Sequence, residues 1–415
     1  MKTMITTGVN LTLNRASKFR TNLLTCHFIG PIEAATNTEM TLLTWILAHG
    51  NQKYPESEQL SLALAKLYGA NLQVYHQNFG RWRDLIVEIS FVDPLSDRAI
   101  GRECLDLIKD IIFEPLLGAA RFDHEVYQAE YQALQTELLD LETNHDFQTF
   151  ASTKAAFFDA PSLQTPRVGN LQELQHLSET HLGQLYQQLI NDWRVEIVGY
   201  GQSLPADEQM KDWAFPARQP VLPQPQILNQ LLAKPKVIER EIVGEQTHLC
   251  LAYTLPDLST QVARDTLRLT AAILGGDEQS LLFRQVREQA GLAYDISATY
   301  DSFLGWLYIE AGVDRQQVDE AQAAISTVFA QARQSIDSQL LELEEENEIN
   351  EQLQSQDQPR TRALQLFADA VFPERHRNQA EFAAAIHHIS LTQVQEMLAA
   401  CQLKVVTRLL NRSPK

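Results

Sequence analysis

Hydrophobic positions along the chain follow two periods. Stretches with apolar residues at alternate positions, or apolar throughout, predict strands, and stretches with apolar residues three or four apart predict helices. The first half has predicted strands at 22–29, 70–75 and 84–92 and predicted helices at 40–49, 57–68 and 97–112. The second half has predicted strands at 248–254, 292–299 and 305–313 and predicted helices at 263–274, 280–290 and 316–334. Each half also has a predicted helical tail, at 122–158 and 340–372.

The two halves repeat one order of elements. A strand and two helices precede a pair of strands and another helix, and the second helix stops at Gly69 in the first half and at Gly291 in the second. These glycines lie 222 residues apart, and the Val-Asp pairs at 92–93 and 313–314 lie 221 apart. One spacing across several elements indicates a duplicated unit. Hairpin-joined strands with helices grouped on one face form an α+β fold, so we predict two homologous halves, each a mainly antiparallel sheet covered by helices.

A proline-rich stretch divides the chain almost in half. Prolines stand at positions 216, 220, 223, 225 and 235. Because proline lacks the amide donor and fixes φ, this composition favours an extended connector over a packed element. We therefore predict an N-terminal α+β domain at 1–214, a linker at 215–236 and a C-terminal α+β domain at 237–415.

Composition narrows the class of protein. The chain has 415 residues, 44% hydrophobic and 21% charged, which is typical of a globular protein. Its net charge of −19 repels phosphate backbones, so nucleic-acid binding is not expected. No apolar run approaches the roughly 20 residues of a membrane span, and no signal-peptide pattern opens the sequence. With four scattered cysteines, interpreted as buried thiols, these features predict a cytoplasmic protein.

A run of glutamates lies in the second helical tail. It contains Glu342, Glu344, Glu345, Glu346 and Glu348. Like charges at this density are most simply interpreted as the solvated face of a helix, without a role in a site.

The segment from Phe283 to Tyr294 carries the most chemistry. Arg287 lies near the predicted helix end and Tyr294 just inside the next strand, so the turn brings their side chains close together. Both side chains donate hydrogen bonds, which suits the carbonyl oxygens of an extended peptide. The alternative is that Arg287 offsets the helix dipole and Tyr294 is a core aromatic.

The same segment resembles a known signature. Gly275-Gly276, Ser280 to Phe283, Val286 to Glu288 and Gly291 to Tyr294 resemble the C-terminal motif of the insulinase/pitrilysin metallopeptidase family, which includes the mitochondrial processing peptidases and bacterial relatives. The match includes the seven-residue spacing from arginine to tyrosine. The resemblance implies the family's duplicated metalloprotease-like fold. It also implies that Arg287 and Tyr294 bind the substrate backbone near the scissile bond.

The zinc motif of that family is missing from the first half. Members carry H-x-x-E-H on a helix, where two histidines and a distant glutamate bind zinc and the motif glutamate is the general base. Aligned from Gly50, these positions hold Thr41, Thr44 and Trp45. Threonine is a poor zinc ligand and tryptophan offers no lone pair, so we predict no metal or cofactor in this chain. His49, one turn further on, is expected to cap the helix end.

Two glutamates occupy the remaining zinc-site positions. Glu130 and Glu137 are seven residues apart, so two helical turns place them on one face. The resemblance aligns them with the family's outer-shell and zinc-binding glutamates. Because Glu137 alone cannot hold zinc tightly, we interpret both residues as relics of a working site.

A substrate grip without a metal site predicts a subunit that is inactive alone. Bacterial members of the family often work as pairs in which one subunit supplies zinc and the other the Arg/Tyr pair, and this sequence resembles the zinc-less partner. We therefore predict a non-catalytic, substrate-binding subunit of a heterodimeric zinc endopeptidase that acts on short or unfolded peptides, with zinc held by a zinc-bearing relative. The alternatives are a stand-alone peptide-binding or scaffold protein and an active metallopeptidase with rearranged ligands.

Overall fold

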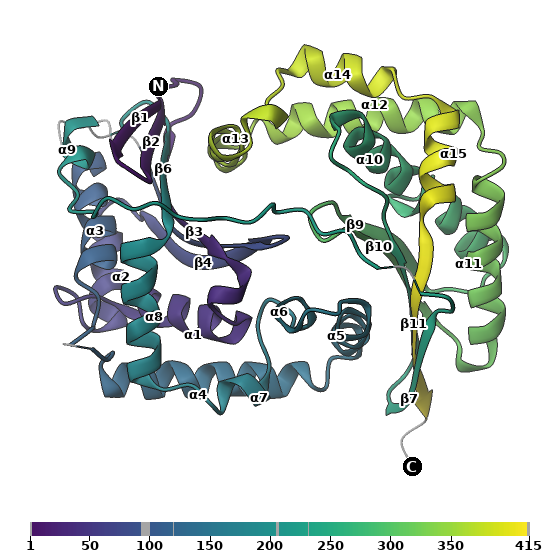
Figure 1. The fold of residues 1–415 in the computed structure, drawn as a ribbon, viewed down its shortest axis with the longest axis horizontal. Helices are drawn as coiled ribbons and strands as arrows, with labels where there is room; N and C mark the ends of the chain where they lie inside the picture. Colours follow the sequence, from purple (N-terminus) through teal and green to yellow (C-terminus); the bar gives the residue numbers. More distant parts are fainter. Residues whose placement is uncertain (1, 93–99, 119, 205–206, 231, 413–415) are drawn as a thin grey trace. The chain divides into compact units, whose positions relative to one another are not determined.

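The computed structural model describes residues 2–92, 100–118, 120–204, 207–230 and 232–412. Asp93 and the predicted helix start at 97–99 lie outside the described residues. The chain forms two compact units, each assembled from three segments (Figure 1). Unit 1 comprises residues 1–138, 167–225 and 355–376, and unit 2 comprises residues 139–166, 226–354 and 377–415.

Unit 1 is built on a six-stranded mixed sheet. Its strands are β1 (Lys2–Thr6), β2 (Val9–Asn14), β3 (Thr21–Pro31), β4 (Asn71–Phe79), β5 (Trp82–Val92) and β6 (Arg194–Tyr200). The spatial order is β1-β2-β6-β3-β5-β4, with β2 and β6 parallel and the other neighbours antiparallel. Residues 22–30 of β3 are buried because β6 and β5 flank its edges and helices pack on the sheet.

Helices cover one face of this sheet. The main ones are α1 (Asn37–His49), α2 (Ser57–Lys66), α3 (Ile100–Phe113) and α8 (Glu179–Asp192). α4 (His124–Leu141) begins in unit 1, and α7 (Leu171–Leu174), α9 (Asp207–Lys211) and the 3-10 turn Ile32–Ala34 are short. Thr36 and Glu39 form a capping box that fixes the start of α1. Leu24, Cys26 and Phe28 of β3 point into the core that these helices enclose.

Unit 2 repeats this plan on a five-stranded sheet. Its strands are β7 (Lys236–Val243), β8 (Thr247–Thr254), β9 (Asp295–Asp301), β10 (Trp306–Val313) and β11 (Gln402–Arg412). The order is β7-β11-β8-β10-β9, with β7 and β11 parallel and the others antiparallel. Among the described residues, β9 has one strand neighbour, so its other edge is left for a further strand.

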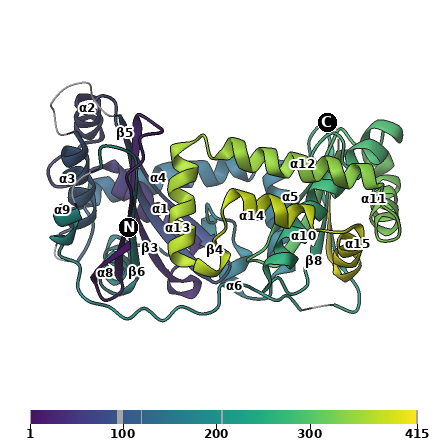
Figure 2. The same cartoon turned by 90° about the horizontal axis from the view of Figure 1, so that it is seen from above.

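The helices of unit 2 enclose a second core. They are α10 (Gln261–Gly275), the π-helix Phe283–Gln289, α11 (Val318–Ala332), α12 (Ser338–Ser355), α14 (Gln379–His387) and α15 (Leu391–Ala400), with a 3-10 turn at Arg315–Gln317. The 3-10 turn Pro373–Arg375 follows α13 and belongs to unit 1. Leu251 and Leu307 of the sheet pack against this layer. Figure 2 shows α12 and α14 running beside α10 at one end of the unit.

Each unit receives one helix from the sequence of the other half. α13 (Pro359–Val371) packs on the sheet of unit 1, where Phe367 stacks on His27 at 3.8 Å between ring centroids. α5 (His145–Phe157) packs on β8 and β11 of unit 2, where the hydroxyls of Thr153 and Thr407 are hydrogen-bonded at 2.8 Å. The short α6 (Pro161–Gln164) follows α5 in the same unit. The two predicted helical tails therefore supply the exchanged helices.

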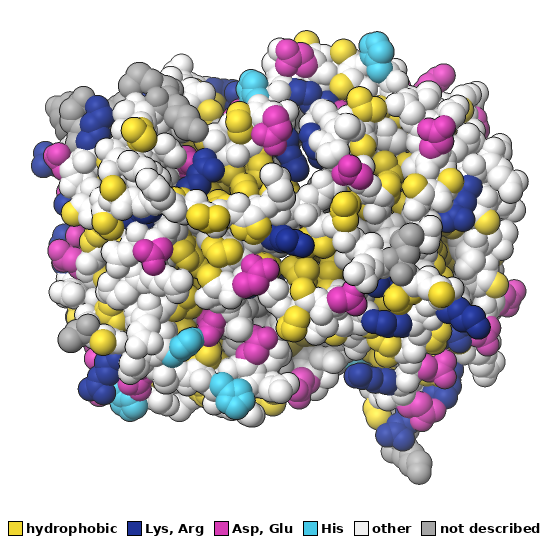
Figure 3. Space-filling view, viewed as in Figure 1, with side chains coloured by type: hydrophobic (Ala, Val, Ile, Leu, Met, Phe, Trp, Pro, Cys, Tyr) yellow, Lys and Arg dark blue, Asp and Glu magenta, His cyan; other side chains and the backbone are white. Residues whose placement is uncertain are grey.

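The predicted fold class is confirmed. Both sheets are mixed and mainly antiparallel, with helices over their faces, and all four cysteines are buried free thiols. In the described part of the chain no helix is long and apolar enough to cross a membrane. On the face drawn in Figure 3, acidic and basic side chains are interspersed over the surface.

The prediction that the glutamate run is solvated was wrong for part of it. Glu342 and Glu346 are exposed, but Glu344 and Glu345 are buried. α12 packs against its own unit through a face that carries carboxylates, so the local charge density misled the interpretation.

Candidate functional site

The turn between the π-helix and β9 positions Arg287 and Tyr294. Gly291 has φ of 63°, the left-handed conformation that glycine adopts without a Cβ clash. Its N–H donates to the Arg287 carbonyl at 3.2 Å, and the Leu292 N–H donates to Val286 at 3.0 Å. The Tyr294 N–H then donates to the Gly312 carbonyl at 2.8 Å, which starts the pairing with β10.

Both side chains of the pair reach solvent. Arg287 is exposed, with its guanidinium carbon 4.6 Å from the centroid of the Phe283 ring. Tyr294 is 59% exposed, so it is not a core aromatic. Its hydroxyl donates to Asp314 Oδ2 at 3.3 Å, which is long for an O–H···O bond and therefore weak. Sequence reasoning did not assign Asp314 to the site, although its Val-Asp pair had marked the repeat.

The first half closes its turn with two equivalent hydrogen bonds but without these side chains. Gly69 has φ of 72°, its N–H donates to Ala65 at 3.3 Å, and the Ala70 N–H donates to the residue six positions earlier at 3.2 Å. Subtracting the 222-residue repeat from Arg287 and Tyr294 gives Ala65 and Leu72. The turn therefore does not require an arginine or a tyrosine at these positions.

The zinc-motif positions lie on α1 and are filled by a neutral polar network. Thr41 Oγ1 lies 3.0 Å from His76 Nε2 on β4 and donates to the Arg167 carbonyl at 3.2 Å. Thr44 Oγ1 donates to the Thr41 carbonyl at 2.8 Å. Trp45 is half-buried against the core of unit 1. Sequence reasoning missed His76, which approaches α1 only through the fold.

His76 is held in its neutral form. The Thr41 hydroxyl has one hydrogen, which goes to Arg167, so it accepts from His76 Nε2–H and leaves Nδ1 without a proton. Nδ1 is buried with no hydrogen-bond partner among the described residues. Burial, and then the positive charges of Arg83 and Arg167, lower the pKa of His76 to about 3. A neutral imidazole held by a threonine is a structural contact.

Glu130 and Glu137, predicted to be relics of a zinc site, lie in different environments. Glu130 Oε1 lies 2.7 Å from His49 Nδ1, so His49 joins α1 to α4 through its side chain instead of capping the helix. Glu137 is exposed on the same helix. Across the described residues, no three His, Cys, Asp or Glu side chains come together in a way that could hold a metal ion. The residues at the motif positions do not fit zinc.

A second hydrogen-bonded chain lies inside unit 1. His27 Nδ1 lies 2.9 Å from Asp84 Oδ2, and His27 Nε2 lies 3.0 Å from Thr25 Oγ1. The order of groups is that of a nucleophile, a base and an orienting carboxylate. All three side chains are buried, and Phe367 stacks on the imidazole, so a substrate does not reach the hydroxyl. We interpret this chain as part of the packing under α13.

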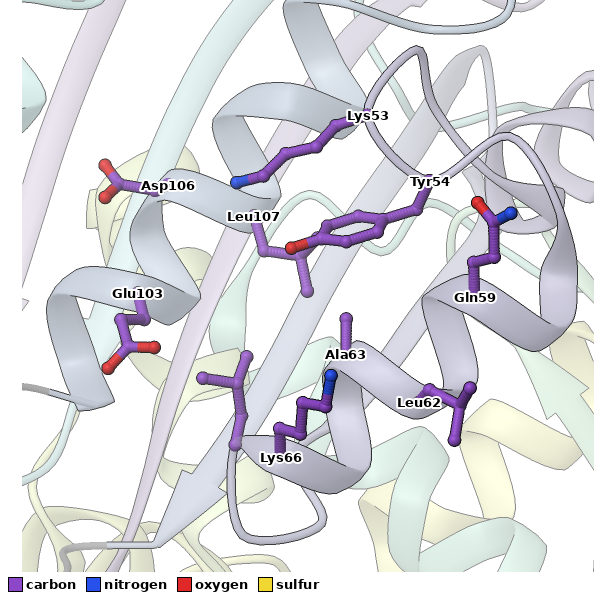
Figure 4. A pocket seen from close by; sticks show the side chains of 10 residues that line it. Lys53, Tyr54, Gln59, Leu62, Ala63, Lys66, Glu103, Asp106 and Leu107 are labelled. Carbon is purple, nitrogen blue, oxygen red and sulfur yellow. The ribbon is translucent and has the colours of Figure 1, made fainter.

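A cavity of about 500 Å³ lies between α2, α3 and the loop before α2 (Figure 4). Lys53 and Tyr54 come from the loop, and Glu103 and Asp106 come from α3. Lys53 Nζ donates to Asp110 at 3.5 Å and lies over the Tyr54 ring. Its lining holds none of the residues predicted from the zinc motif, so this cavity is separate from that part of the molecule.

Comparison with known proteins finds one family model and one relative that match much of the chain. Residues 170–347 match the family model described as the peptidase M16 inactive domain. The chain is also 23% identical over 340 residues to a Bacillus subtilis protein named probable inactive metalloprotease YmfF, with 78% of this chain and 77% of the relative covered. The model match assigns residues 170–347 to the M16 peptidase family. The resemblance to the insulinase family is thereby confirmed, and the chain is a homologue of an inactive M16 metalloprotease.

Further matches cover a shorter stretch of sequence or are to solved structures. A Bacillus subtilis protein named uncharacterized zinc protease YmxG is 26% identical over 235 residues, 54% of each chain. The fold matches a conserved protein from Enterococcus faecalis V583 with a TM-score of 0.93, 23% identity and coverage of 100% of this chain and 99% of that one. An M16 inactive domain from Pseudomonas fluorescens matches with a TM-score of 0.79 and 14% identity, with the same coverage of each chain. These structures share the fold.

Proposed function

We propose that this M16 chain is a non-catalytic, peptide-binding subunit of a two-chain zinc endopeptidase. The observation that carries the proposal is the exposed pair Arg287 and Tyr294 on a turn that the first half builds with Ala65 and Leu72. Exposed side chains that a turn does not need for its geometry are available for binding.

The pair suits the backbone of an extended peptide. Arg287 offers a charged donor and Tyr294 a neutral one, and peptide carbonyls are acceptors. Tyr294 directly precedes β9 and Arg287 lies in the π-helix before the turn, and β9 has a free edge in the described part of the chain. A peptide lying along that edge gains main-chain hydrogen bonds, while the two side chains bind its carbonyls at one end.

The metal half of the reaction belongs on another chain in this proposal. The positions of the zinc motif hold Thr41, Thr44 and Trp45, and the first of these is engaged by His76. A relative named as a zinc protease exists in Bacillus subtilis, and a zinc-bearing protein of that kind is the partner we infer. Catalysis then depends on the pair of chains, with this one aligning short or unfolded peptides.

The test measures peptide cleavage by the chain alone, by a zinc-bearing M16 relative alone and by the two together. We expect cleavage above that of either chain only in the mixture. In the mixture, Arg287→Ala should lower kcat/KM about tenfold or more, because a hydrogen bond to a charged group contributes about 1.5–3 kcal/mol. Tyr294→Phe should lower it less, because a neutral donor is lost.

Arg284→Ala is the matched control, since it removes an exposed arginine from the same π-helix. Equal kinetics for Arg287→Ala and Arg284→Ala would remove the proposed role of the pair. Cleavage together with stoichiometric zinc in the lone chain would indicate an active metallopeptidase. Peptide binding without recovery of any zinc-bearing relative would favour a stand-alone binding protein.

A further inference from the structure

A cavity of about 500 Å³ in unit 2 has an acidic lining. It lies between the end of α10, strand β9 and one face of α12. Its charged lining residues are Asp277, Glu344, Glu348, Glu351 and Arg268. Four carboxylates face one guanidinium, and the volume is within the range of about 300–1,000 Å³ typical of ligand pockets.

The carboxylates that line the cavity differ in how many hydrogen-bond donors they have. Arg268 Nη1 donates to Glu348 Oε2 at 3.2 Å, so these two side chains form an ion pair. Asp277 Oδ1 accepts from the backbone N–H groups of Gln279 and Ser280. Glu344 is 3% exposed, and its Oε1 has no hydrogen-bond partner among the described residues. A buried carboxylate oxygen without a donor is costly unless a cation or a proton reaches it.

Electrostatics around Glu344 agree with this reading. Burial, and then the negative charge of Asp277, raise the pKa of Glu344 to about 7. Its other oxygen has a weak donor at 3.4 Å, the amide of Asn347. The cavity therefore lacks positive charge near its most buried acid. The described carboxylates do not converge as metal ligands, which leaves an organic cation as the complementary group.

We propose that this cavity binds the ammonium or guanidinium group of a lysine or arginine side chain in a bound peptide. Ala298 and Tyr300 of β9 line the cavity, and alternate residues of a strand face the same side of a sheet. A peptide paired with the free edge of β9 would point every second side chain towards the same side. The inference rests on the proposed peptide-binding function and adds a preference for a basic residue.

The position of the cavity sets the register of that residue. Ala298 follows Tyr294 by four residues, which is about 13 Å along a strand at roughly 3.3 Å per residue. Gly275 keeps α10 close to the strand, because a Cβ there would lie 2.7 Å from the Ala298 backbone nitrogen. The basic side chain should therefore lie about four residues from the position bound by the Arg287–Tyr294 pair.

A lysine scan tests the proposal on the purified chain. A fluorescein-labelled neutral nonapeptide receives one lysine at each position in turn, and affinity is measured by fluorescence anisotropy. We expect one position to bind about tenfold more tightly than the neutral parent, as one charge-assisted hydrogen bond provides, and its immediate neighbours to show no gain. A uniform gain at every position would indicate non-specific attraction to an acidic protein and would overturn the proposal.

Variants identify the cavity as the source of the gain. Glu344→Gln keeps the shape and removes the charge, so it should abolish the gain for the best lysine peptide without weakening the neutral peptide. Glu342→Gln is the matched control, since this exposed residue lies on the same helix outside the cavity. Arg287→Ala should weaken the lysine and neutral peptides equally. A gain that survives Glu344→Gln, or disappears in Glu342→Gln, contradicts the assignment.

A small probe separates this inference from the proposed function. n-Butylammonium imitates the end of a lysine side chain and needs no peptide groove. It should raise the melting temperature of wild type and Arg287→Ala, but not of Glu344→Gln. Failure of all peptides to bind, with this difference intact, would reject the peptide function and keep the cation site. Equal shifts in wild type and Glu344→Gln would reject the cation site.

Discussion

At the residue scale, the positions that we aligned with the zinc motif hold a hydrogen-bonded contact between Thr41 and His76. His76 lies against Thr41, which we predicted to occupy the position of the first motif histidine, and is 5% exposed. A histidine so placed could be mistaken for a ligand. Its bond to the threonine and its lowered pKa instead make it a neutral part of the interface between α1 and β4.

The buried imidazole predicts an acid-dependent loss of stability. The folded pKa of about 3 lies below the ordinary value of 6.5, so the unfolded chain binds more protons between these limits. The contribution of neutral His76 to the free energy of unfolding is fully present above pH 6.5 and is lost as pH falls towards 3. From pH 7 to 4.5 wild type should lose about 2–3 kcal/mol more than His76→Gln, measured as urea unfolding free energies.

His176→Gln controls for that comparison because His176 is exposed. The unfolding free energy of His176→Gln should change with pH in the same way as that of wild type. If His76→Gln and wild type lose the same free energy of unfolding, the imidazole is not held neutral in the folded protein.

At the scale of elements, the two turns at Gly69 and Gly291 show which residues the backbone conformation requires and which positions can vary. Gly69 and Gly291 both have positive φ and close the same pattern of hydrogen bonds. A Cβ added at either glycine would meet nothing within 4 Å. The glycines are therefore needed for backbone conformation, while the residues around them are free to carry function.

Substituting alanine for either turn glycine should lower the free energy of unfolding by the same amount. Gly69→Ala and Gly291→Ala should each destabilise the protein by about 1–2 kcal/mol, the cost of a left-handed conformation for a residue with a Cβ. Gly291→Asn should cost less, because asparagine tolerates that conformation. Gly275→Ala is the steric contrast, since its Cβ meets the β9 backbone, and should cost more than either. Urea unfolding of the four variants measures the differences, and a negligible effect at Gly291 would contradict the argument.

The elements also show how far sequence reasoning reaches. Both turn glycines and the strands around them were predictable, because hydrophobic period and glycine stops are local signals. Glu344 was not predictable as a buried acid, because its environment is made by α10 and β9, which lie more than forty residues away in sequence. His76 and Asp314 were missed because their contacts with Thr41 and Tyr294 are also made by the fold and not by neighbouring residues. Local sequence placed Arg287 and Tyr294 on their turn, and the fold added the acid that binds the phenol.

At the scale of the whole molecule, each half of the sequence supplies a helix to the unit formed mainly by the other half. α5 is encoded in the first half and packs in unit 2, and α13 is encoded in the second half and packs in unit 1. Hydrophobic pattern predicted both helical tails but carries no information on which sheet each one covers. A consequence is that each unit depends on residues far away in the sequence.

That dependence can be measured with intrinsic tryptophans. The chain has five, of which Trp306 belongs to unit 2 and Trp45, Trp82, Trp193 and Trp213 belong to unit 1. Phe157 of α5 is buried with its ring centroid 5.3 Å from that of Trp306. Phe367 of α13 is buried against His27. A Trp306→Phe background reports unit 1 alone, and the difference from wild type reports unit 2.

Truncating each phenylalanine should destabilise the unit in which it packs, not the half that encodes it. Phe157→Ala should lower the unfolding free energy of the Trp306 transition by about 3–5 kcal/mol, and Phe367→Ala should do so for the unit 1 transition. Leu364→Ala, at an exposed position of α13, should change either by less than about 0.5 kcal/mol. Urea unfolding followed by fluorescence gives both transitions. If Phe157→Ala moved the unit 1 signal and left the Trp306 signal in place, α5 would not be the helix that completes unit 2.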